Sequence, residues 1–353
     1  MRSLASFAPD ELAAQLADWG FKPGHAARVL RGFYASGGQV APGKAPWPAG
    51  LAAKLRALHA PLATLAARQV AEDLTTKLLL RLGDGRTVES VLMPDYRPDR
   101  AAGCVSSQVG CAMGCDFCAT TKTGFERNLT AGEMVEQFLA LRAEAGAVGR
   151  RLQTLVFMGM GEPLLNLDAV VVAVERMASN ALGALGSRQI TVSTVGIVPG
   201  IDALAAARLG VHLAVSLHAP DDATRAQLLP MGRRFGVGEI LAAADRYQAS
   251  SGRPVTIQYC LLREVNDSPA QARQLADLLR GRTMHVNLLR YNPTGLSLRG
   301  ATYAASSDAA AGAFLAELRA RRVVAHFRRP RGRDIDAACG QLRRRAALAA
   351  AAP

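Results

Sequence analysis

Three cysteines fall within eight residues of this 353-residue chain, in the segment Cys111-Ala-Met-Gly-Cys115-Asp-Phe-Cys118. Iron–sulfur clusters are held by cysteine thiolates at comparably tight spacing. Three thiolates on one loop can hold three irons of a [4Fe–4S] cluster and leave the fourth iron without a protein ligand. Because that iron can bind a small molecule and pass it an electron, the C-x3-C-x2-C spacing predicts an open, redox-active site.

Zinc and unmetallated thiols are the alternatives for the same segment. A closed zinc site needs four ligands, and the nearest histidine after the cysteines is His212, so Cys104 would have to be the fourth ligand. Inert or redox thiols need no metal at all. A disulfide framework is disfavoured in a chain of this length without a secretory signal. The spacing alone leaves these alternatives open.

Basic residues outnumber acidic ones, 42 to 29, which gives a net charge of +13. This balance suggests a polyanionic partner such as nucleic acid. Arginines gather at positions 233–234 and again between 319 and 333. Arginine suits phosphate because it is always charged and donates in a fork. In an alanine- and arginine-rich chain, however, many such side chains only solvate helices.

Nothing in the composition indicates a membrane protein. The chain has no run of 18 uncharged apolar residues, and its first residues lack the apolar stretch of a signal peptide. Closely spaced cysteines fit a reducing compartment. We therefore expect a cytoplasmic protein with no membrane partner.

The predicted secondary structure around the cysteines changes from helices to strands and then to alternating strands and helices along the chain. Residues 1–60 show helical periodicity, whereas residues 75–82 and 87–93 predict strands across a Gly-Asp-Gly turn. Residues 94–100 are predicted to be a linker. From about residue 104 strands and helices alternate, with strands at 152–158, 189–194, 211–217, 254–259 and 284–289 and helices at 130–145, 168–179, 199–208, 236–249 and 268–280.

This alternation favours a parallel sheet with helices outside it. The units are too few for a closed eightfold barrel, so we predict an α/β fold with a partial (βα)6 barrel and a site at the C-terminal strand ends. The predicted organisation is an accessory domain of helices and a β hairpin over 1–95, the barrel over 96–300, and a C-terminal extension with a basic tail over 301–353.

Small and polar residues follow several of the predicted strands. Glycines in Gly159-Met-Gly161-Glu162-Pro163 would let the backbone approach a ligand, and Glu162 could accept hydrogen bonds from an ammonium group. Ser193-Thr-Val-Gly196, Ser216-Leu217-His218 and Asn292-Pro end later strands. Each alone is also explained as turn chemistry. Together they predict one site beside the cysteine segment.

Longer motifs resemble a known family. The cysteine triplet is similar to the signature of radical S-adenosylmethionine (SAM) enzymes. The stretches that resemble the RlmN/Cfr family of RNA adenine methyltransferases extend over about residues 75–342 and are Cys104-Val-Ser-Ser-Gln-Val-Gly-Cys111, Gly124-Phe-Glu-Arg-Asn-Leu, Phe157-Met-Gly-Met-Gly-Glu-Pro-Leu, Ser216-Leu-His-Ala and Asp334-Ile-Asp-Ala-Ala-Cys339-Gly-Gln-Leu.

The resemblance implies a cofactor set. Cys111, Cys115 and Cys118 would hold one [4Fe–4S] cluster, whose open iron would bind SAM through its amino and carboxylate groups. One SAM would methylate a cysteine, and a second would be cleaved to a radical that takes hydrogen from that methyl group. The residues that match SAM-contacting positions of the family are Gly161, Glu162, Ser193, Ser216, Leu217, His218 and Asn292.

The resemblance also implies three catalytic residues. Cys339 resembles the methylated cysteine, Cys104 the cysteine that helps release the enzyme–RNA adduct, and Glu89 the proton acceptor. The plainer interpretation of the two cysteines is a buried pair or a structural disulfide, and that of Glu89 is an exposed strand carboxylate. Whether Cys104 and Cys339 pair in the isolated protein stays open. Cys260 is most simply a core residue.

The function implied is methylation of C2 of an adenosine in 23S rRNA near the peptidyl transferase centre, with an adenosine beside the tRNA anticodon as a second target. C8 methylation, as in the resistance-conferring branch, and another RNA target are the enzymatic alternatives. A zinc-stabilised RNA-binding protein and a thiol–disulfide enzyme are rivals of other classes. We expect an unstacked target base, an electron donor such as flavodoxin, and a monomer.

Overall fold

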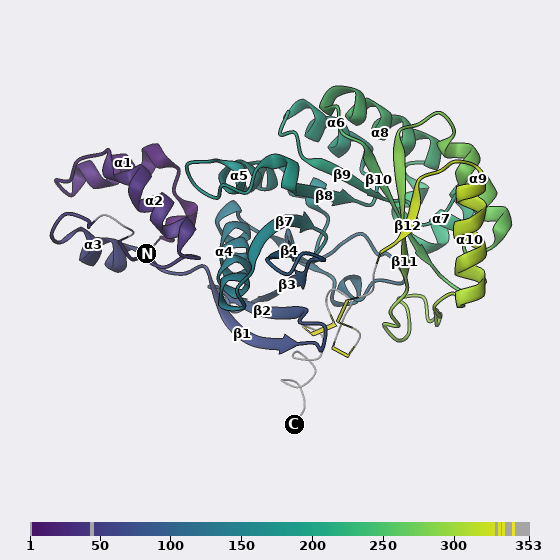
Figure 1. The fold of residues 1–353 in the computed structure, drawn as a ribbon, viewed down its shortest axis with the longest axis horizontal. Coiled ribbons are helices and arrows are strands. Elements are labelled where there is room, and N and C mark those ends of the chain that lie inside the picture. The colour runs from purple at the N-terminus through teal and green to yellow at the C-terminus, as the bar shows by residue number, and fades with distance from the viewer. Residues whose placement is uncertain (1, 43–45, 329–330, 333, 336–340, 343–353) are drawn as a thin grey trace.

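Ten strands of the chain form one sheet, in which neighbouring strands follow the order β1-β2-β3-β4-β7-β8-β9-β10-β11-β12 (Figure 1). The structure, a computed structural model, describes residues 2–42, 46–328, 331–332, 334–335 and 341–342. The sheet is open, with β1 and β12 at its two edges. Since the N-terminal strands and the later parallel strands share this sheet, hydrogen bonds connect them without a break.

The parallel part of the sheet begins at β4 (Arg100–Cys104), which pairs with β7 (Arg151–Phe157). It continues through β8 (Ile190–Thr194), β9 (His212–Ser216), β10 (Val255–Leu261), β11 (Met284–Arg290) and the short β12 (Ala325–Phe327). The prediction of a partial parallel barrel is thus confirmed. The segment predicted as a linker is shorter than expected, because Arg100 already pairs in β4.

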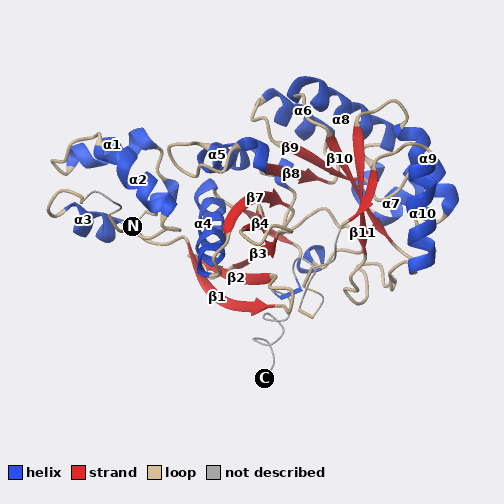
Figure 2. Ribbon diagram, viewed as in Figure 1, coloured by secondary structure: helices blue, strands red, loops and turns tan. Residues whose placement is uncertain are grey.

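Helices cover the outer side of the parallel strands (Figure 2). They connect successive strands, as right-handed parallel crossovers require. Their bounds are α4 Ala131–Ala147, α5 Leu167–Ala178, α6 Val198–Ala206, α7 Asp222–Leu228, α8 Val237–Ser251, α9 Pro269–Leu279 and α10 Asp308–Ala320. The predicted capping box of α4 is present, since the Thr130 side chain accepts from the Glu133 N–H and the Glu133 carboxylate accepts from the Thr130 N–H.

Three antiparallel strands extend the sheet beyond β4. β2 (Thr76–Leu82) and β3 (Thr87–Pro94) form the expected hairpin, and β1 (Ala63–Val70) pairs with β2 at the edge. β3 then pairs with β4, so the accessory hairpin continues directly into the barrel sheet. The sequence indicated neither β1 nor this continuity.

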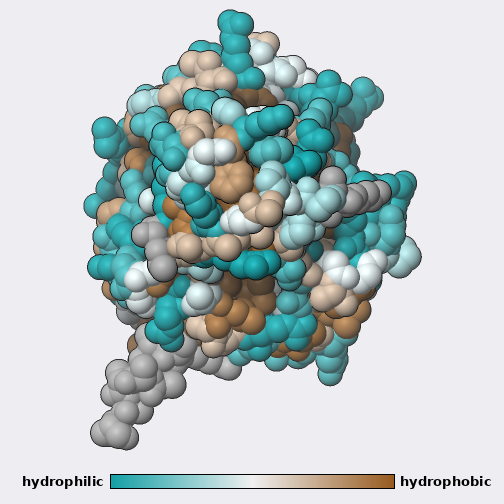
Figure 3. All heavy atoms as spheres, turned by 90° about the vertical axis from the view of Figure 1, so that its left-hand side faces the viewer, coloured by the Kyte–Doolittle hydropathy of each residue, from teal (hydrophilic) through white to brown (hydrophobic). Residues whose placement is uncertain are grey.

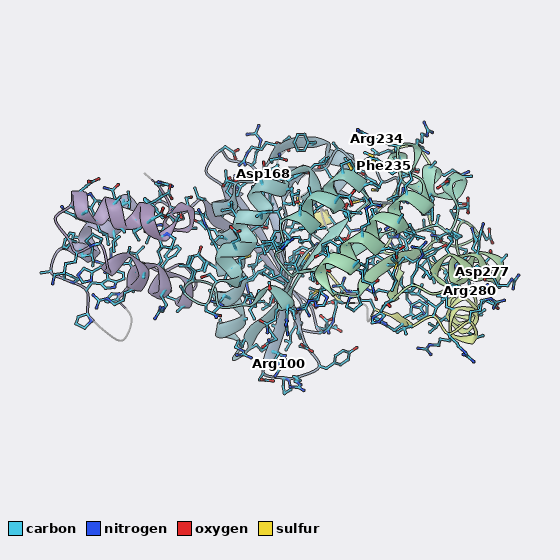
Figure 4. All side chains as sticks on the ribbon, turned by 90° about the horizontal axis from the view of Figure 1, so that it is seen from above. Arg100, Asp168, Arg234, Phe235, Asp277 and Arg280 are labelled. Carbon is cyan, nitrogen blue, oxygen red and sulfur yellow. The ribbon has the colours of Figure 1, made fainter. Side chains whose placement is uncertain are left out.

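The N-terminal helices are α1 (Pro9–Asp18), α2 (His25–Ala35) and α3 (Leu51–Leu58), which bury an apolar face between them. Hydrophilic side chains dominate this end of the molecule, with smaller hydrophobic areas between them (Figure 3). Seen from above, the helices project from the sheet at the end opposite to Asp277 and Arg280 (Figure 4). Arg176 of α5 donates to the carbonyl of Ala5, just before α1, at 2.8 Å. This bond connects the N-terminal segment to the barrel. No helix in the described part of the chain has the length and apolar character needed to cross a membrane.

Candidate active site

A cavity of about 400 Å³ lies at the C-terminal ends of the parallel strands. This is where side chains from several strands can converge in such sheets. The expected site residues that line it are Cys104, Cys111, Cys115, Cys118, Gly161, Glu162, Ser193, Ser216, His218 and Asn292. The fold therefore brings together the cysteine segment and four separate strand ends.

The three clustered cysteines lie on a loop between two short antiparallel strands, β5 (Gln108–Gly110) and β6 (Phe125–Asn128). The Cys111 N–H donates to the Gly124 carbonyl at 2.9 Å, and the Cys118 N–H donates to the Cys115 carbonyl at 3.0 Å. The Thr121 hydroxyl donates to the carbonyls of Cys115 and Cys118, each at 3.0 Å. These backbone bonds fix the loop without using the sulfur atoms.

The chemistry of this loop fits an iron–sulfur cluster. Burial raises the pKa of Cys111 to about 12 and that of Cys115 well above its usual value. A positive metal centre beside these thiols would therefore favour the thiolate form that ligation requires. Among the residues that the structure describes, no three His, Cys, Asp or Glu side chains surround the position of a single ion. Three cysteine thiols that line one cavity fit the ligand set of an iron–sulfur cluster, whereas a closed zinc site needs a fourth ligand.

Glu162 presents a buried carboxylate to the cavity. It accepts hydrogen bonds from the backbone N–H groups of Val195, at 2.8 Å, and Leu164, at 3.1 Å. Burial raises the pKa of Glu162 to about 7, although these two bonds act in the opposite direction. A carboxylate held in this way is suited to receive an ammonium group, which would favour its ionised form.

Gly161 lines the cavity and is also required as glycine by its surroundings. Its φ is +101°, and a Cβ there would lie 2.8 Å from the Gln108 backbone nitrogen. No other residue would fit here without strain. Gln108 in turn accepts from the Glu162 N–H at 2.8 Å, so the turn packs tightly against β5.

His218 is a buried, neutral side chain with a left-handed backbone (φ +60°). Its Nδ1 accepts from the Cys260 N–H at 2.9 Å, and its ring meets the Phe117 ring edge-on at 5.0 Å. Burial lowers its pKa to about 3. Leu217 is fully buried beside it and is not among the residues that line the cavity.

The expected catalytic residues are placed only in part. Cys104 lines the cavity at the end of β4, whereas Cys339 lies outside the described residues. Glu89 is buried, which excludes the exposed-carboxylate interpretation, and it forms an ion pair with Lys77 at 3.1 Å. Alternation along β3 puts Glu89 on the same face as Val91, which lines the cavity. A Cys104–Cys339 disulfide is not supported by the part of the chain that the structure describes.

Several residues in or beside the cavity were given no role in this site by the sequence. Cys260, expected only in the core, also lines the cavity, as does Gln258. Arg328 lines it too and places its guanidinium against the sulfur atoms of Met93 at 3.5 Å and Met158 at 3.8 Å. Arg225 is fully buried on α7, close to the cysteine loop. Of these residues, only Cys260 had a signal in the sequence that could have predicted a place in the site, namely its position near the end of a predicted strand.

Comparisons with known proteins agree with this geometry. The radical SAM superfamily model matches residues 105–276. A probable dual-specificity RNA methyltransferase RlmN 1 from Opitutus terrae is 72% identical over 342 residues, which cover 97% of this chain and 96% of that protein. A probable dual-specificity RNA methyltransferase RlmN from Rhodopirellula baltica is 44% identical, with coverage of 97% and 90%.

A solved structure is similar over almost the same length. The crystal structure of a radical SAM methyltransferase from Sphaerobacter thermophilus superposes with a TM-score of 0.88 at 42% identity. The match covers 97% of this chain and 99% of that one. The similarity therefore includes the N-terminal helices as well as the barrel.

Proposed function

Because the chain belongs to the RlmN family of radical SAM RNA methyltransferases, we propose that it methylates C2 of an adenosine in 23S rRNA and an adenosine in tRNA. The observation that carries this proposal is the single cavity that gathers three cysteines with the SAM-motif residues of four strand ends. The dual-specificity name of the relatives favours two RNA targets.

The residues around the cavity have distinct tasks in this reaction. Cys111, Cys115 and Cys118 would hold one [4Fe–4S] cluster, which supplies an electron to SAM when bound. Glu162 would accept hydrogen bonds from the SAM ammonium group, since its carboxylate is already fixed by two backbone donors. The other residues assigned to SAM are Gly161, Ser193, Ser216, Leu217, His218 and Asn292, and each turnover uses two SAM molecules.

Cys339 is assigned to carry the methyl group and deliver its carbon to the adenine ring. C2 of adenine is electron-poor, so a polar methyl transfer there is unfavourable, whereas a carbon tethered to the protein reaches the ring with an entropic advantage. The described residues on either side support this role. Gly332 donates to the Asp73 carboxylate at 3.1 Å, and Gln341 donates to the Pro293 carbonyl at 3.1 Å. Both contacts lie next to cavity-lining residues, Thr75 and Asn292.

Cys104 and Glu89 are assigned to release the product. Release needs a base that removes the ring proton and a sulfur that breaks the link to Cys339. Cys104 lines the cavity at the end of β4, and Glu89 lies on the cavity face of the neighbouring strand β3. In this assignment the two groups act from adjacent strands.

The RNA would reach the cavity past a basic rim. Arg328 and Arg331 line the cavity, and a guanidinium there can hold the phosphate next to an unstacked base. We assign RNA docking to residues 1–95, the radical chemistry to 96–300 and the Cys339 segment to 301–353. A flavodoxin-type protein would supply the electron to a monomeric enzyme.

Mass spectrometry of RNA treated with the protein, SAM and a reductant tests the proposal. We expect 2-methyladenosine at one site in a 23S rRNA fragment and one site in tRNA. Detection of 8-methyladenosine would instead support the alternative, C8 methylation as in the resistance-conferring branch. Unmodified RNA from protein that holds its iron and sulfide would refute the assignment.

Two cysteine variants test the division of labour. Cys339→Ala should keep the cluster but put no methyl group on RNA, because the carbon carrier is absent. Cys104→Ala should trap RNA covalently on the protein, because the adduct cannot be resolved. Free methylated RNA from Cys339→Ala would contradict its role.

Metal content and one further variant separate the rivals. Anaerobically purified protein should contain iron and sulfide, whereas a colourless, zinc-loaded protein would support the binding-protein alternative. A thiol–disulfide enzyme that uses Cys104 and Cys339 would stay active after Cys118→Ala. The radical enzyme would not, since it loses a cluster ligand.

A further inference from the structure

Arg225 is a buried cation whose partners are incomplete. It lies on α7, is fully buried, and is the largest side chain in the described part of the chain with so little exposure. One terminal nitrogen donates to the Val195 carbonyl. Its Nε and its Nη1 have no hydrogen-bond partner among the described residues. A guanidinium that leaves two donors unused in the interior is unusual.

Such an arrangement is unfavourable unless an anion is present. Taking a charge out of water is unfavourable even after relaxation of the protein, and each unsatisfied buried donor adds to that penalty. No acidic side chain in the described chain forms an ion pair with Arg225. The carboxylate on its own helix, Asp222, acts on Arg225 only through space, and it accepts a hydrogen bond from the Val237 N–H at 2.6 Å at the start of α8.

The cysteine loop lies directly against the helix that carries Arg225. The Asp116 N–H, one residue after Cys115, donates to the Leu228 carbonyl of α7 at 2.9 Å. Val195, whose carbonyl accepts from Arg225, lines the same cavity as Cys115. His218, which packs against Phe117 of the cysteine loop, lines it too. The helix that carries Arg225 is therefore packed against the cysteine loop, and the guanidinium is bonded to the backbone of a cavity residue.

We propose that Arg225 is the internal counter-charge of the iron–sulfur cluster, a positioning residue that raises the reduction potential of the cluster and stabilises its three thiolate ligands. This inference rests on the proposed function. Three thiolates give the ligand set a charge of −3, and one-electron reduction by an external reductant adds one more negative charge at the same place. A fixed cation nearby favours the more negative state.

Arg225 also connects the two halves of the cofactor site. The Val195 carbonyl accepts from Arg225, while the Val195 N–H donates to the Glu162 carboxylate at 2.8 Å. The peptide groups flanking Val195 therefore lie between a cation beside the cluster and the carboxylate assigned to the SAM ammonium group. Removal of the cation should act first on the cluster and only secondarily on SAM.

The test compares midpoint potentials of the cluster by EPR-monitored titration of the full-length holoenzyme, first without SAM and then with it. Arg225→Met removes the charge at nearly constant volume, and Arg225→Lys keeps it. Arg142→Met is the matched control, because Arg142 is a partly buried arginine that bonds to the Tyr34 and Gly183 carbonyls far from the loop. We expect a more negative potential for Arg225→Met without SAM, and wild-type potentials for Arg225→Lys and Arg142→Met.

An unchanged potential for Arg225→Met would overturn the inference, and so would a shift that appears only when SAM is bound. If Arg225→Met fails to hold the cluster, thermal unfolding of the iron-free chain distinguishes a role of the charge in cluster binding from a structural role of the side chain. A variant at least as stable as wild type shows that the charge served the cluster, whereas a less stable one shows a merely structural role. A wild-type protein without a cluster would instead refute the proposed function.

Discussion

Single buried polar residues hold this site in shape through bonds to backbone groups. Glu162 and His218 both accept from main-chain N–H groups, and Asn266 links the two sides by donating to the His218 carbonyl at 2.7 Å and the Cys260 carbonyl at 2.8 Å. Because each buried acceptor has a fixed donor, the side chains are positioned before any ligand arrives. A change in the ionisation of Glu162 or His218 should therefore change the free energy of unfolding.

His218 predicts a pH dependence of stability. Its pKa is about 3 in the folded chain against an ordinary value of 6.5. Between these values only the unfolded chain binds the proton, so stability is full above pH 6.5 and falls as the pH drops towards 3. Urea unfolding of the iron-free protein at pH 7.5 and 5.0 should show a smaller loss for His218→Asn than for wild type. Equal losses would show that His218 is not held neutral.

The Lys77–Glu89 pair predicts a large effect of a single substitution. Both side chains are buried, with 1% and 2% exposure. Lys77→Met removes the cation beside a buried carboxylate and should lower the free energy of unfolding by about 3–5 kcal/mol. Arg246→Met is the control, because the Arg246–Asp202 pair is exposed and screened by solvent, so its loss should change stability far less. Denaturant titration measures both, and similar values for the two variants would contradict the prediction.

At the scale of elements, tight strand–turn junctions bring the strand ends to the cysteine loop. The turn after β7 packs against β5 through Gly161 and Gln108. The residues after β11 reach the loop from the other side, where the Tyr303 hydroxyl donates to the Asp116 carboxylate at 2.7 Å and Lys122 donates to the Thr294 carbonyl at 2.6 Å. Junctions this close tolerate little added volume.

Gly161→Ala tests this junction. The new Cβ would collide with Gln108, and a φ of +101° is strained for any residue except glycine, so we expect a loss of at least about 2 kcal/mol of stability together with cluster binding. Gly312→Ala is the matched control in α10, where nothing lies within 4 Å. It should stabilise the helix by about 0.5–1 kcal/mol. Thermal unfolding and iron content measure the two effects, and intact Gly161→Ala protein would refute the clash.

The sequence was sufficient for elements with strong patterns. The hairpin at 75–82 and 87–93 and the helix at 130–145 agree closely with β2, β3 and α4. β1 was missed, and β4 could not be given bounds, because their alanines and glycine have weak strand preference and pairing with a neighbour decides their conformation. Arg225 was missed because an arginine in a short polar helix is expected on the exposed face of that helix. The cysteine loop that packs against α7, through the Asp116–Leu228 hydrogen bond, is far from it in the sequence.

At the scale of the whole molecule, the net charge of +13 predicts salt-sensitive RNA binding. Affinity for single-stranded RNA should fall with log salt at a slope of about −0.7 for each phosphate contacted. Arg328→Met should reduce the slope by about one such contact, because this side chain lines the cavity. Arg280→Met is the control, since Arg280 pairs with Asp277 at the end of the molecule away from the N-terminal helices and does not line the cavity (Figure 4). Fluorescence anisotropy gives the slopes, and identical slopes for all three proteins would contradict the placement.

The unbroken ladder from β1 to β12 has a mechanical consequence. Under the proposed function, an RNA docked on residues 1–95 and presented at the cysteine loop would be held against a single stiff sheet, since a packed sheet yields very little. Selection would then depend on distance: two RNAs of unlike shape would both be accepted if each can bring an adenosine to the same distance from its docking site. The flexibility that this requires would lie in the RNA and not in the enzyme.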